Sequence, residues 1–220
     1  MVNTFYDPAQ AARIRQALLE LKPKLSYLEL PTFFVHLPPP CSSRSNVPQS
    51  EYKGVKYNLV EANLDGKDKI PARILWPSGV YGIWPIRLIA FFQLITELAL
   101  ENRTTPVKQN IPIPVSVAFI TRLFKPKAGR KEIARVKRLM DILATHPIHI
   151  IRRNEATLFL ILLVKTGKGY ALNAALFRPP FTGQKHFRFG IFRSTKLRIP
   201  LKLLRIQSRH FKCVALNIAA

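Results

Sequence analysis

The sequence predicts an α+β fold with two closely spaced helices and a β-hairpin at its centre. Apolar residues recur at helical spacing in some segments and fill short, strand-like runs in others, and prolines or glycines separate these segments. Apolar residues make up 48% of the 220-residue chain, which is enough to build a core and argues against a disordered basic tail. We expect two parts: an N-terminal helix with a Pro/Ser-rich arm over residues 1–50, and the main domain over residues 51–220.

The N-terminal part begins with a well-marked helix. Asp7 can cap a helix and Pro8 is tolerated at the first helical position, which predicts a helix over residues 8–22. Its apolar side consists of Ala11, Ile14, Leu18 and Leu21. Pro23 ends the helix, and the Pro- and Ser-rich residues 30–50 predict an extended arm without a core of its own.

The main domain begins with two short strands and an apolar helix. Residues 55–64 and 72–76 have the composition of strands, and the glycines and proline after them predict a turn. Residues 86–100 are apolar on almost every side, which predicts a helix buried in the core. We expect its adjacent aromatic residues, Phe91 and Phe92, to pack in that core.

Two helices and a turn follow. Residues 115–124 predict a short helix, residues 125–129 a basic turn, and residues 130–144 a second helix. Apolar residues of the second helix recur at i, i+3, i+7 and i+10, which predicts one packing side made of Ile133, Val136, Met140 and Leu143. Basic residues occupy much of the remaining surface, so we expect one side of this helix to pack and the other to meet anions.

Strands predominate in the C-terminal part. Residues 147–153 and 156–165 predict two strands joined by a two-residue turn at Asn154-Glu155, because Asn tolerates a positive φ in such turns. Further elements are expected as a strand at 170–177, a strand at 186–192 and a helix over 200–218.

The order helix, basic turn, helix and hairpin is typical of a winged helix-turn-helix. In such domains the second helix enters the major groove of DNA and the hairpin, or wing, lies along the adjoining phosphates. The candidate DNA-binding residues are therefore Arg130, Lys131, Arg135, Lys137 and Arg138 on the second helix, and Arg152 and Arg153 at the tip of the hairpin. The alternative is a solvated amphipathic helix whose charges face only water.

Charge is concentrated in the C-terminal part of the chain. The chain has 35 Lys and Arg against 12 Asp and Glu, a net charge of +23. Residues 1–120 contribute 13 basic and 9 acidic side chains, whereas residues 121–220 contribute 22 basic and 3 acidic side chains, and no acidic residue follows Glu155. The excess positive side chains repel one another in the compact state, and a bound polyanion would relieve this repulsion. Nucleic acid is the expected partner, and an anionic membrane surface is the weaker alternative.

Two other functions remain open. Residues 177–198 interleave Phe181, Phe187, Phe189 and Phe192 with Lys185, Arg188, Arg193 and Lys196. Exposed aromatic rings between cations suit RNA or a single strand, whose bases stack on them, although the same pattern fits a strand with its phenylalanines in the core. The third class is an interaction protein that docks a partner through the apolar helix 86–100.

Several classes find little support in the sequence. Clustered carboxylates for a two-metal nuclease are lacking in the basic half, and the spacing around Lys165–Gly169 is not that of a P-loop, so we expect no catalytic activity and no cofactor. His146 and His149 would point to opposite faces of a strand, which disfavours a shared metal. Two distant cysteines, no secretory signal and no apolar run of about 20 residues predict a cytoplasmic protein without a membrane span.

Four segments of the chain share an order of motifs: residues 77–100, Ser116-Val-Ala-Phe-Ile-Thr-Arg-Leu, Ala128-Gly-Arg with Ala134-Arg-Val-Lys-Arg-Leu, and Ile199-Pro-Leu-Lys-Leu-Leu. This order resembles that of plasmid-encoded replication initiators of the RepA type. The similarity covers residues 70–220 with diffuse patterns. The resemblance implies sequence-specific binding of double-stranded DNA at a plasmid origin without enzymatic activity. The partners expected with it are host replication proteins and a second copy of the chain as a homodimer.

Overall fold

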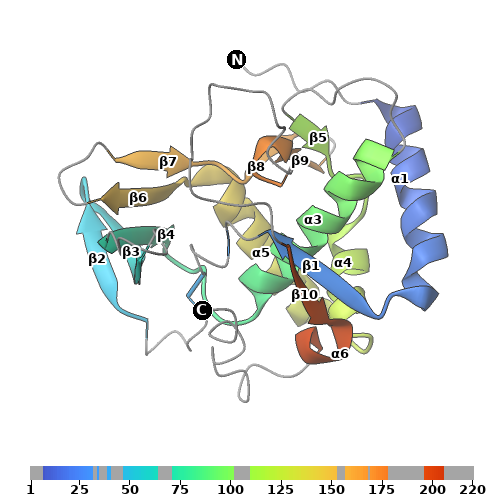
Figure 1. Ribbon diagram of the computed structural model, residues 1–220, viewed down its shortest axis with the longest axis horizontal. Coiled ribbons are helices and arrows are strands. Elements are labelled where there is room, and N and C mark those ends of the chain that lie inside the picture. Colours follow the sequence, from blue (N-terminus) through green and yellow to red (C-terminus); the bar gives the residue numbers. More distant parts are fainter. Residues whose placement is uncertain are drawn as a thin grey trace.

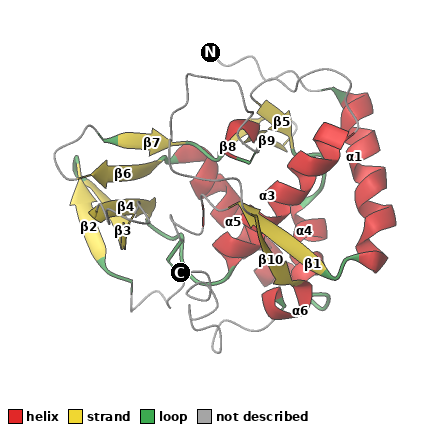
Figure 2. Cartoon of the chain, viewed as in Figure 1, coloured by secondary structure: helices red, strands yellow, loops and turns green. Residues whose placement is uncertain are grey.

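The computed structural model describes residues 7–31, 34, 39–40, 47–63, 71–101, 110–152, 157–167, 169–177 and 196–205. Within these residues the protein is α+β, which confirms the predicted class (Figures 1 and 2). The helices are α1 (Pro8–Leu21), α3 (Trp84–Glu101), α4 (Val117–Phe124), α5 (Arg130–Thr145) and α6 (Leu201–Leu204), with 3-10 turns η1 (Lys22–Lys24) and η3 (Ala174–Leu176). The strands are β1 (Tyr27–Pro31), β2 (Gln49–Tyr52), β3 (Val55–Asn63), β4 (Pro71–Pro77), β5 (Asn110–Pro112), β6 (Ile148–Arg152), β7 (Leu158–Leu160), β8 (Leu163–Thr166), β9 (Gly169–Asn173) and β10 (Lys196–Pro200).

The largest sheet is antiparallel and has the strand order β2-β3-β4-β6-β7. It lies to the left in Figure 1, whereas α1 and α3 lie to the right. Side chains alternate across it, so that Ile74 and Ile150, which pair directly, both enter the core. The predicted hairpin is thus present as β6 and β7, but β6 also pairs with β4 and lies inside the sheet.

The hairpin differs from the prediction in register and in length. Ile150 pairs with Leu158, whereas a two-residue turn would pair it with Phe159. The observed register directs Ile148 and Leu160 together toward the core, which decides between the two pairings. The turn residues 153–156 lie outside the described residues.

The single strand predicted at 156–165 is two strands in the structure. Leu162 and Leu163 are adjacent and both buried, and one flat strand cannot direct two adjacent side chains to the same side. The chain therefore turns away after β7, and β8 joins a second sheet of order β5-β9-β8. The strand predicted at 170–177 is shortened to β9, because η3 follows it.

The N-terminal residues belong to the same hydrophobic core as the main domain. Strand β1 pairs with β10, and Leu28, Leu30 and Phe34 are buried. Leu30 and Phe34 of the predicted arm are thus buried in a core that they share with the main domain. The boundary proposed at residue 50 stays a prediction.

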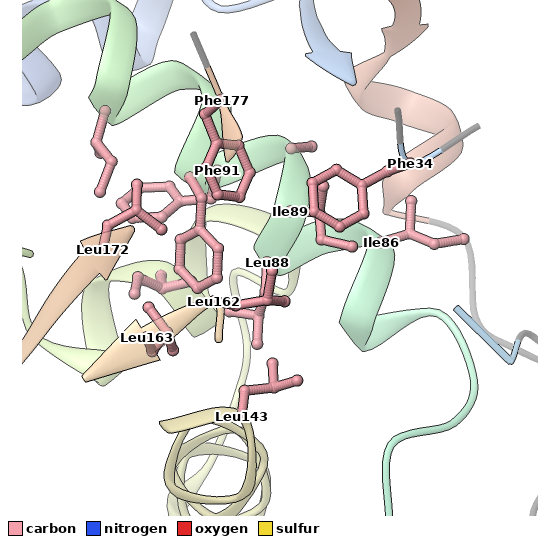
Figure 3. Packing of buried hydrophobic residues seen from close by; sticks show 14 of the residues in the cluster. Phe34, Ile86, Leu88, Ile89, Phe91, Leu143, Leu162, Leu163, Leu172 and Phe177 are labelled. Carbon is pink, nitrogen blue, oxygen red and sulfur yellow. The ribbon is translucent and has the colours of Figure 1, made fainter. Parts of the chain in front are cut away.

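Helix α3 runs through the centre of this core. Fourteen of its 18 residues are buried, including Phe91 and Phe92, as predicted. Phe177 packs edge-on against Phe92 with 6.0 Å between ring centroids and stacks on Phe34 at 5.4 Å. Figure 3 shows Phe34, Phe91 and Phe177 among the buried hydrophobic side chains. Because α3 is covered on almost every side, it offers no apolar side to a docking partner.

The remaining helix predictions hold close to the expected bounds. Asp7 caps α1 by accepting hydrogen bonds from the backbone amides of Ala9 and Gln10, at 3.0 and 3.2 Å. The helices predicted at 115–124 and 130–144 are α4 and α5. Of the last predicted helix only α6 is described, and the strand predicted at 186–192 lies outside the described residues.

Candidate nucleic-acid interface

Helices α4 and α5 are consecutive and are joined by a short basic turn. Ser116 caps α4 by accepting a hydrogen bond from the amide of Phe119 at 3.2 Å. The turn is closed by the amide of Ala128, which donates to the carbonyl of Lys125 at 2.9 Å, while the Ala128 side chain is buried. These contacts fix where α5 begins, at Arg130.

The buried side of α5 differs from the predicted one, because Leu139 takes the place of Ile133. Val136, Met140 and Leu143 are buried as expected, but Leu139 is buried as well and Ile133 is only half-buried. The buried side therefore centres between Val136 and Leu143. The five predicted cations on α5 are all exposed, namely Arg130, Lys131, Arg135, Lys137 and Arg138.

The exposed cations of α5 lie on two sides of the helix. Lys131, Arg135 and Arg138, at i, i+4 and i+7, share one side, and we call these three residues the basic stripe. Arg130 and Lys137 lie on the neighbouring side, together with Asp141, which is at i+4 from Lys137. The basic stripe has acidic neighbours on α5 at i, i+3 spacing, and the charge of Arg135 contributes to the lowered pKa of Glu132.

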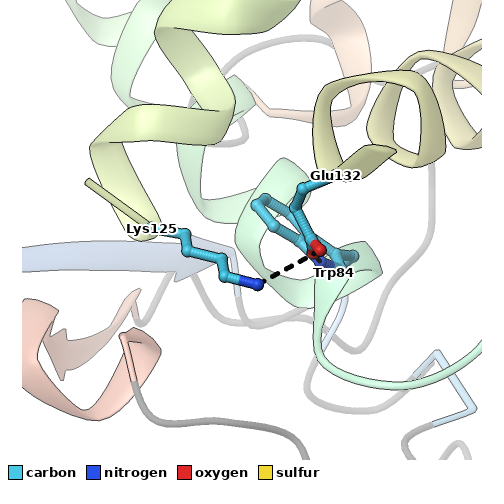
Figure 4. Close-up of polar contacts among 3 residues, drawn as sticks. All are labelled: Trp84, Lys125 and Glu132. Carbon is cyan, nitrogen blue, oxygen red and sulfur yellow. Dashed lines mark hydrogen bonds and ion pairs between the residues drawn. The ribbon is translucent and has the colours of Figure 1, made fainter. Parts of the chain in front are cut away.

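Both acidic residues of α5 are engaged with the rest of the fold. Glu132 accepts a hydrogen bond from the indole N–H of Trp84 at 2.8 Å and pairs with the Lys125 ammonium at 3.2 Å (Figure 4). Burial would raise the pKa of Glu132, but the hydrogen bonds from Trp84 and Lys125 outweigh burial, so the pKa lies below its ordinary value. Glu132 thus joins the first turn of α5 to the start of α3.

Asp141 makes a corresponding attachment at the other end of α5. It accepts a hydrogen bond from the Tyr170 hydroxyl at 3.1 Å and pairs with the Lys165 ammonium at 3.0 Å. Burial, reinforced by the Asp141 carboxylate, raises the pKa of Tyr170 to about 12, so the phenol stays protonated and donates. Because both carboxylates are held this way, no described carboxylate pairs with the basic stripe.

Arg135 has one neighbour that its sequence position did not suggest. Its guanidinium carbon lies 6.0 Å from the ring centroid of Tyr81, which is half-buried in the segment between β4 and α3. A ring at this distance attracts the cation without neutralising it. The arrangement leaves the guanidinium hydrogens of Arg135 available to an anion.

The side chains of the two hairpin arginines, Arg152 and Arg153, lie outside the described part of the structure. The backbone of Arg152 pairs with Ala72 at the end of β6, and its side chain is outside the described residues. Arg153 lies outside them entirely. The aromatic and basic residues between 178 and 195, including Phe187 and Phe189, are outside them as well.

The sequence analysis did not predict an aromatic cluster of Tyr52, Tyr57 and His149. It lies on the face of the large sheet opposite to the core-facing Ile148 and Ile150. The Tyr57 hydroxyl lies 3.2 Å from Nε2 of His149, and the Tyr52 ring lies 4.9 Å from the His149 ring. Burial, with a smaller contribution from Lys53, holds the pKa of His149 below its ordinary value. These residues come from β2, β3 and β6, so no local pattern could have grouped them.

Comparisons of the chain with protein-family models, with curated proteins and with solved structures give no match. Among the helices that the structure describes, none combines the length and the apolarity that a membrane crossing requires. In the described part of the chain, no three His, Cys, Asp or Glu side chains gather to hold a metal ion.

Proposed function

We propose that this chain is a sequence-specific double-stranded DNA-binding protein that inserts α5 into the major groove. The observation that carries the proposal is the basic stripe, three exposed cations in line on a helix whose two carboxylates are engaged elsewhere. Arginine can donate two hydrogen bonds to guanine or to a phosphate, and an α-helix fits the major groove. The ion pairs given for the two carboxylates of α5 are with Lys125 and Lys165, which lie outside the stripe.

The proposal assigns different tasks to different cations. Arg135 and Arg138 read base edges, while Lys131, Arg130 and Lys137 hold phosphates, which set affinity and register. Strands β6 and β7 act as the wing of a winged helix, with Arg152 and Arg153 along the adjoining phosphates. The net charge of +23 favours association with any polyanion, so specificity has to come from α5.

The biological role that fits this activity is initiation of plasmid replication. The resemblance of residues 70–220 to RepA-type initiators supports the role, because such proteins bind origin DNA and need no catalytic centre. The proposal includes host replication proteins as partners and a homodimer on a two-fold symmetric site. It places the protein in the cytoplasm, where the origin is.

The test is a salt titration of binding to a plasmid-origin duplex, a random duplex and a single strand. We expect a preference for one duplex that persists as salt rises. Replacement of Lys131, Arg135 and Arg138 by Gln should remove that preference. The matched control replaces three exposed cations of α1 and η1, namely Arg13, Arg15 and Lys24, and so removes the same charge.

Two outcomes would overturn the proposal. The first is that all three ligands bind alike, with log K falling by about 0.9 per phosphate contacted for each tenfold rise in salt concentration. The positive charge would then bind nucleic acid without regard to its sequence. If the single strand is preferred and the preference is lost on substitution of Phe187 or Phe189 and not of Arg135, the protein is an RNA or single-strand binding module.

A further inference from the structure

The segment between β4 and α3 follows one side of α5 along much of its length. Gly79 lies against Ile142, since a Cβ added to Gly79 would come within 2.9 Å of the Ile142 Cδ1. Tyr81 lies near Arg135, and Trp84 donates to Glu132. On a helix the three contacted positions, 132, 135 and 142, fall on one side, which overlaps the basic stripe, because Arg135 is a member of the stripe and Ile142 is at i+4 from Arg138.

This segment is itself held rigidly by the sheet and by α3. Asn58, which is 3% exposed on β3, donates from its side-chain amide to the carbonyl of Val80 at 2.8 Å. Trp84 is 4% exposed, and the Arg87 guanidinium carbon lies 4.5 Å from the centroid of its ring. Arg87 in turn donates to the carbonyl of Leu204 in α6 at 2.5 Å. A connected set of buried polar contacts therefore extends from the sheet and α6 to the first turn of α5.

We infer that residues 79–84 are a positioning segment for α5, and that Trp84 and Glu132 set how sharply the protein discriminates between DNA sequences. This inference rests on the proposed function. A bidentate contact to a base demands a fixed helix orientation, whereas a phosphate contact tolerates small rotations because the long cation adjusts. Loosening the first turn of α5 should therefore reduce specific binding and leave non-specific binding intact.

A change of charge at Glu132 tests this inference, because an electrostatic role and a positioning role predict opposite changes in affinity for the preferred duplex. Glu132→Gln raises the net charge by one unit, so a purely electrostatic role for Glu132 predicts tighter binding to every duplex. A positioning role predicts a loss for the preferred duplex only. Trp84→Phe removes the N–H donor, keeps an aromatic ring beside Arg87 and leaves the charge unchanged.

The experiment uses the full chain and two probes, a duplex that the chain selects from a randomised pool and a scrambled duplex of the same composition. We expect Trp84→Phe and Glu132→Gln each to lower the ratio of the two affinities about tenfold, the equivalent of one charge-assisted hydrogen bond. The affinity for the scrambled duplex should stay the same for Trp84→Phe and rise slightly for Glu132→Gln. The salt slope should stay the same for Trp84→Phe.

Thermal unfolding of each variant separates positioning from a loss of fold. If Trp84→Phe does not fold, the ratio of the two affinities is measured for Glu132→Gln and for Tyr81→Leu instead. Tyr81 is half-buried. An unchanged ratio in the folded variants, or an equal loss on both duplexes, would overturn the inference while the proposed function stands. If the wild-type chain selects no preferred duplex, the proposed function fails, and the inference fails with it.

Discussion

Arginine has two distinct roles in this protein, and its surroundings decide which. Arg87 is 4% exposed, and burial lowers its pKa to about 10, although Glu132 opposes that shift. It still carries its charge at neutral pH, and it uses that charge inside the fold, against Trp84 and the Leu204 carbonyl. Arg135 and Arg138 are exposed. Under the proposed function, only the exposed arginines can donate hydrogen bonds to DNA.

The cations of the basic stripe should differ in what they contribute. We expect Arg135→Ala or Arg138→Ala to relax sequence preference by about 1–3 kcal/mol at one base pair, because each loses hydrogen bonds to a base edge. Lys131→Ala should weaken binding to all duplexes alike, because it loses a phosphate contact. Affinities for a set of duplexes with single base-pair changes measure both effects. Equal losses on specific and random DNA for all three variants would reject the assignment of α5 as a recognition helix.

His149 should make the stability of the fold depend on pH. Its pKa in the folded chain lies below the ordinary value of 6.5, so the unfolded chain binds a proton more readily. The stability contributed by neutral His149 is present above that ordinary value and is lost as pH falls toward the folded pKa. We expect a lower urea midpoint at about pH 5.5 than at about pH 7.5.

The control for this pH dependence is a second histidine. His149→Phe should flatten the dependence, and the corresponding change at His146, which is exposed at the end of α5, should keep it. If the pH dependence of the urea midpoint persists unchanged in His149→Phe, it comes from other titratable groups.

At the scale of elements, the turn before α3 is the place where one added methyl group should matter most. Gly79 has φ of +93°, and its Cβ would lie 2.9 Å from Ile142 in α5. We expect Gly79→Ala to lower the free energy of unfolding by about 1–3 kcal/mol, from backbone strain and overpacking together. Gly54→Ala is the matched control, because Gly54 also has a positive φ, of +76°, and an added Cβ there meets nothing within 4 Å. Chemical denaturation measures the free energy of unfolding of both variants. An equal loss in both would contradict the contact between residue 79 and Ile142.

The helices were predictable from the sequence because each carries its own local signals. Asp7 with Pro8, Ser116, and the apolar period of residues 130–144 mark them without reference to the rest of the chain. The pairing of β1 with β10 and the division of residues 156–165 depend on partners far away in sequence, so no local pattern could reveal them. The same holds for the site: the cations of α5 were predictable, whereas Trp84 and Tyr81 reach them only through the fold.

At the scale of the whole molecule, one hydrophobic core includes residues from both ends of the described chain. Ile14 of α1 and Leu204 of α6 belong to the same buried cluster as Leu143 of α5. Such sharing couples the stability of the N-terminal residues to that of α5.

We expect the chain to unfold in a single cooperative transition. Leu28→Ala in β1 and Leu143→Ala in α5 should each cost about 2–5 kcal/mol, since both side chains are buried, and each should shift the whole transition. Circular dichroism and the fluorescence of Trp76 and Trp84 should give coincident curves. An earlier, separate transition in Leu28→Ala would show that the N-terminal residues unfold independently.

The pairing of the first strand with the last described one has a consequence for how this protein is made. Tyr27 pairs with Pro200, so β1 has no partner until almost all of the 220 residues have left the ribosome. Loops of this length close slowly, and proteins with contacts so distant in sequence fold more slowly than proteins with local ones. During synthesis Leu28 and Leu30 can pack only against earlier elements such as α3, and the backbone of β1 lacks its partner strand. We expect a chaperone to bind this unpaired apolar strand until β10 arrives.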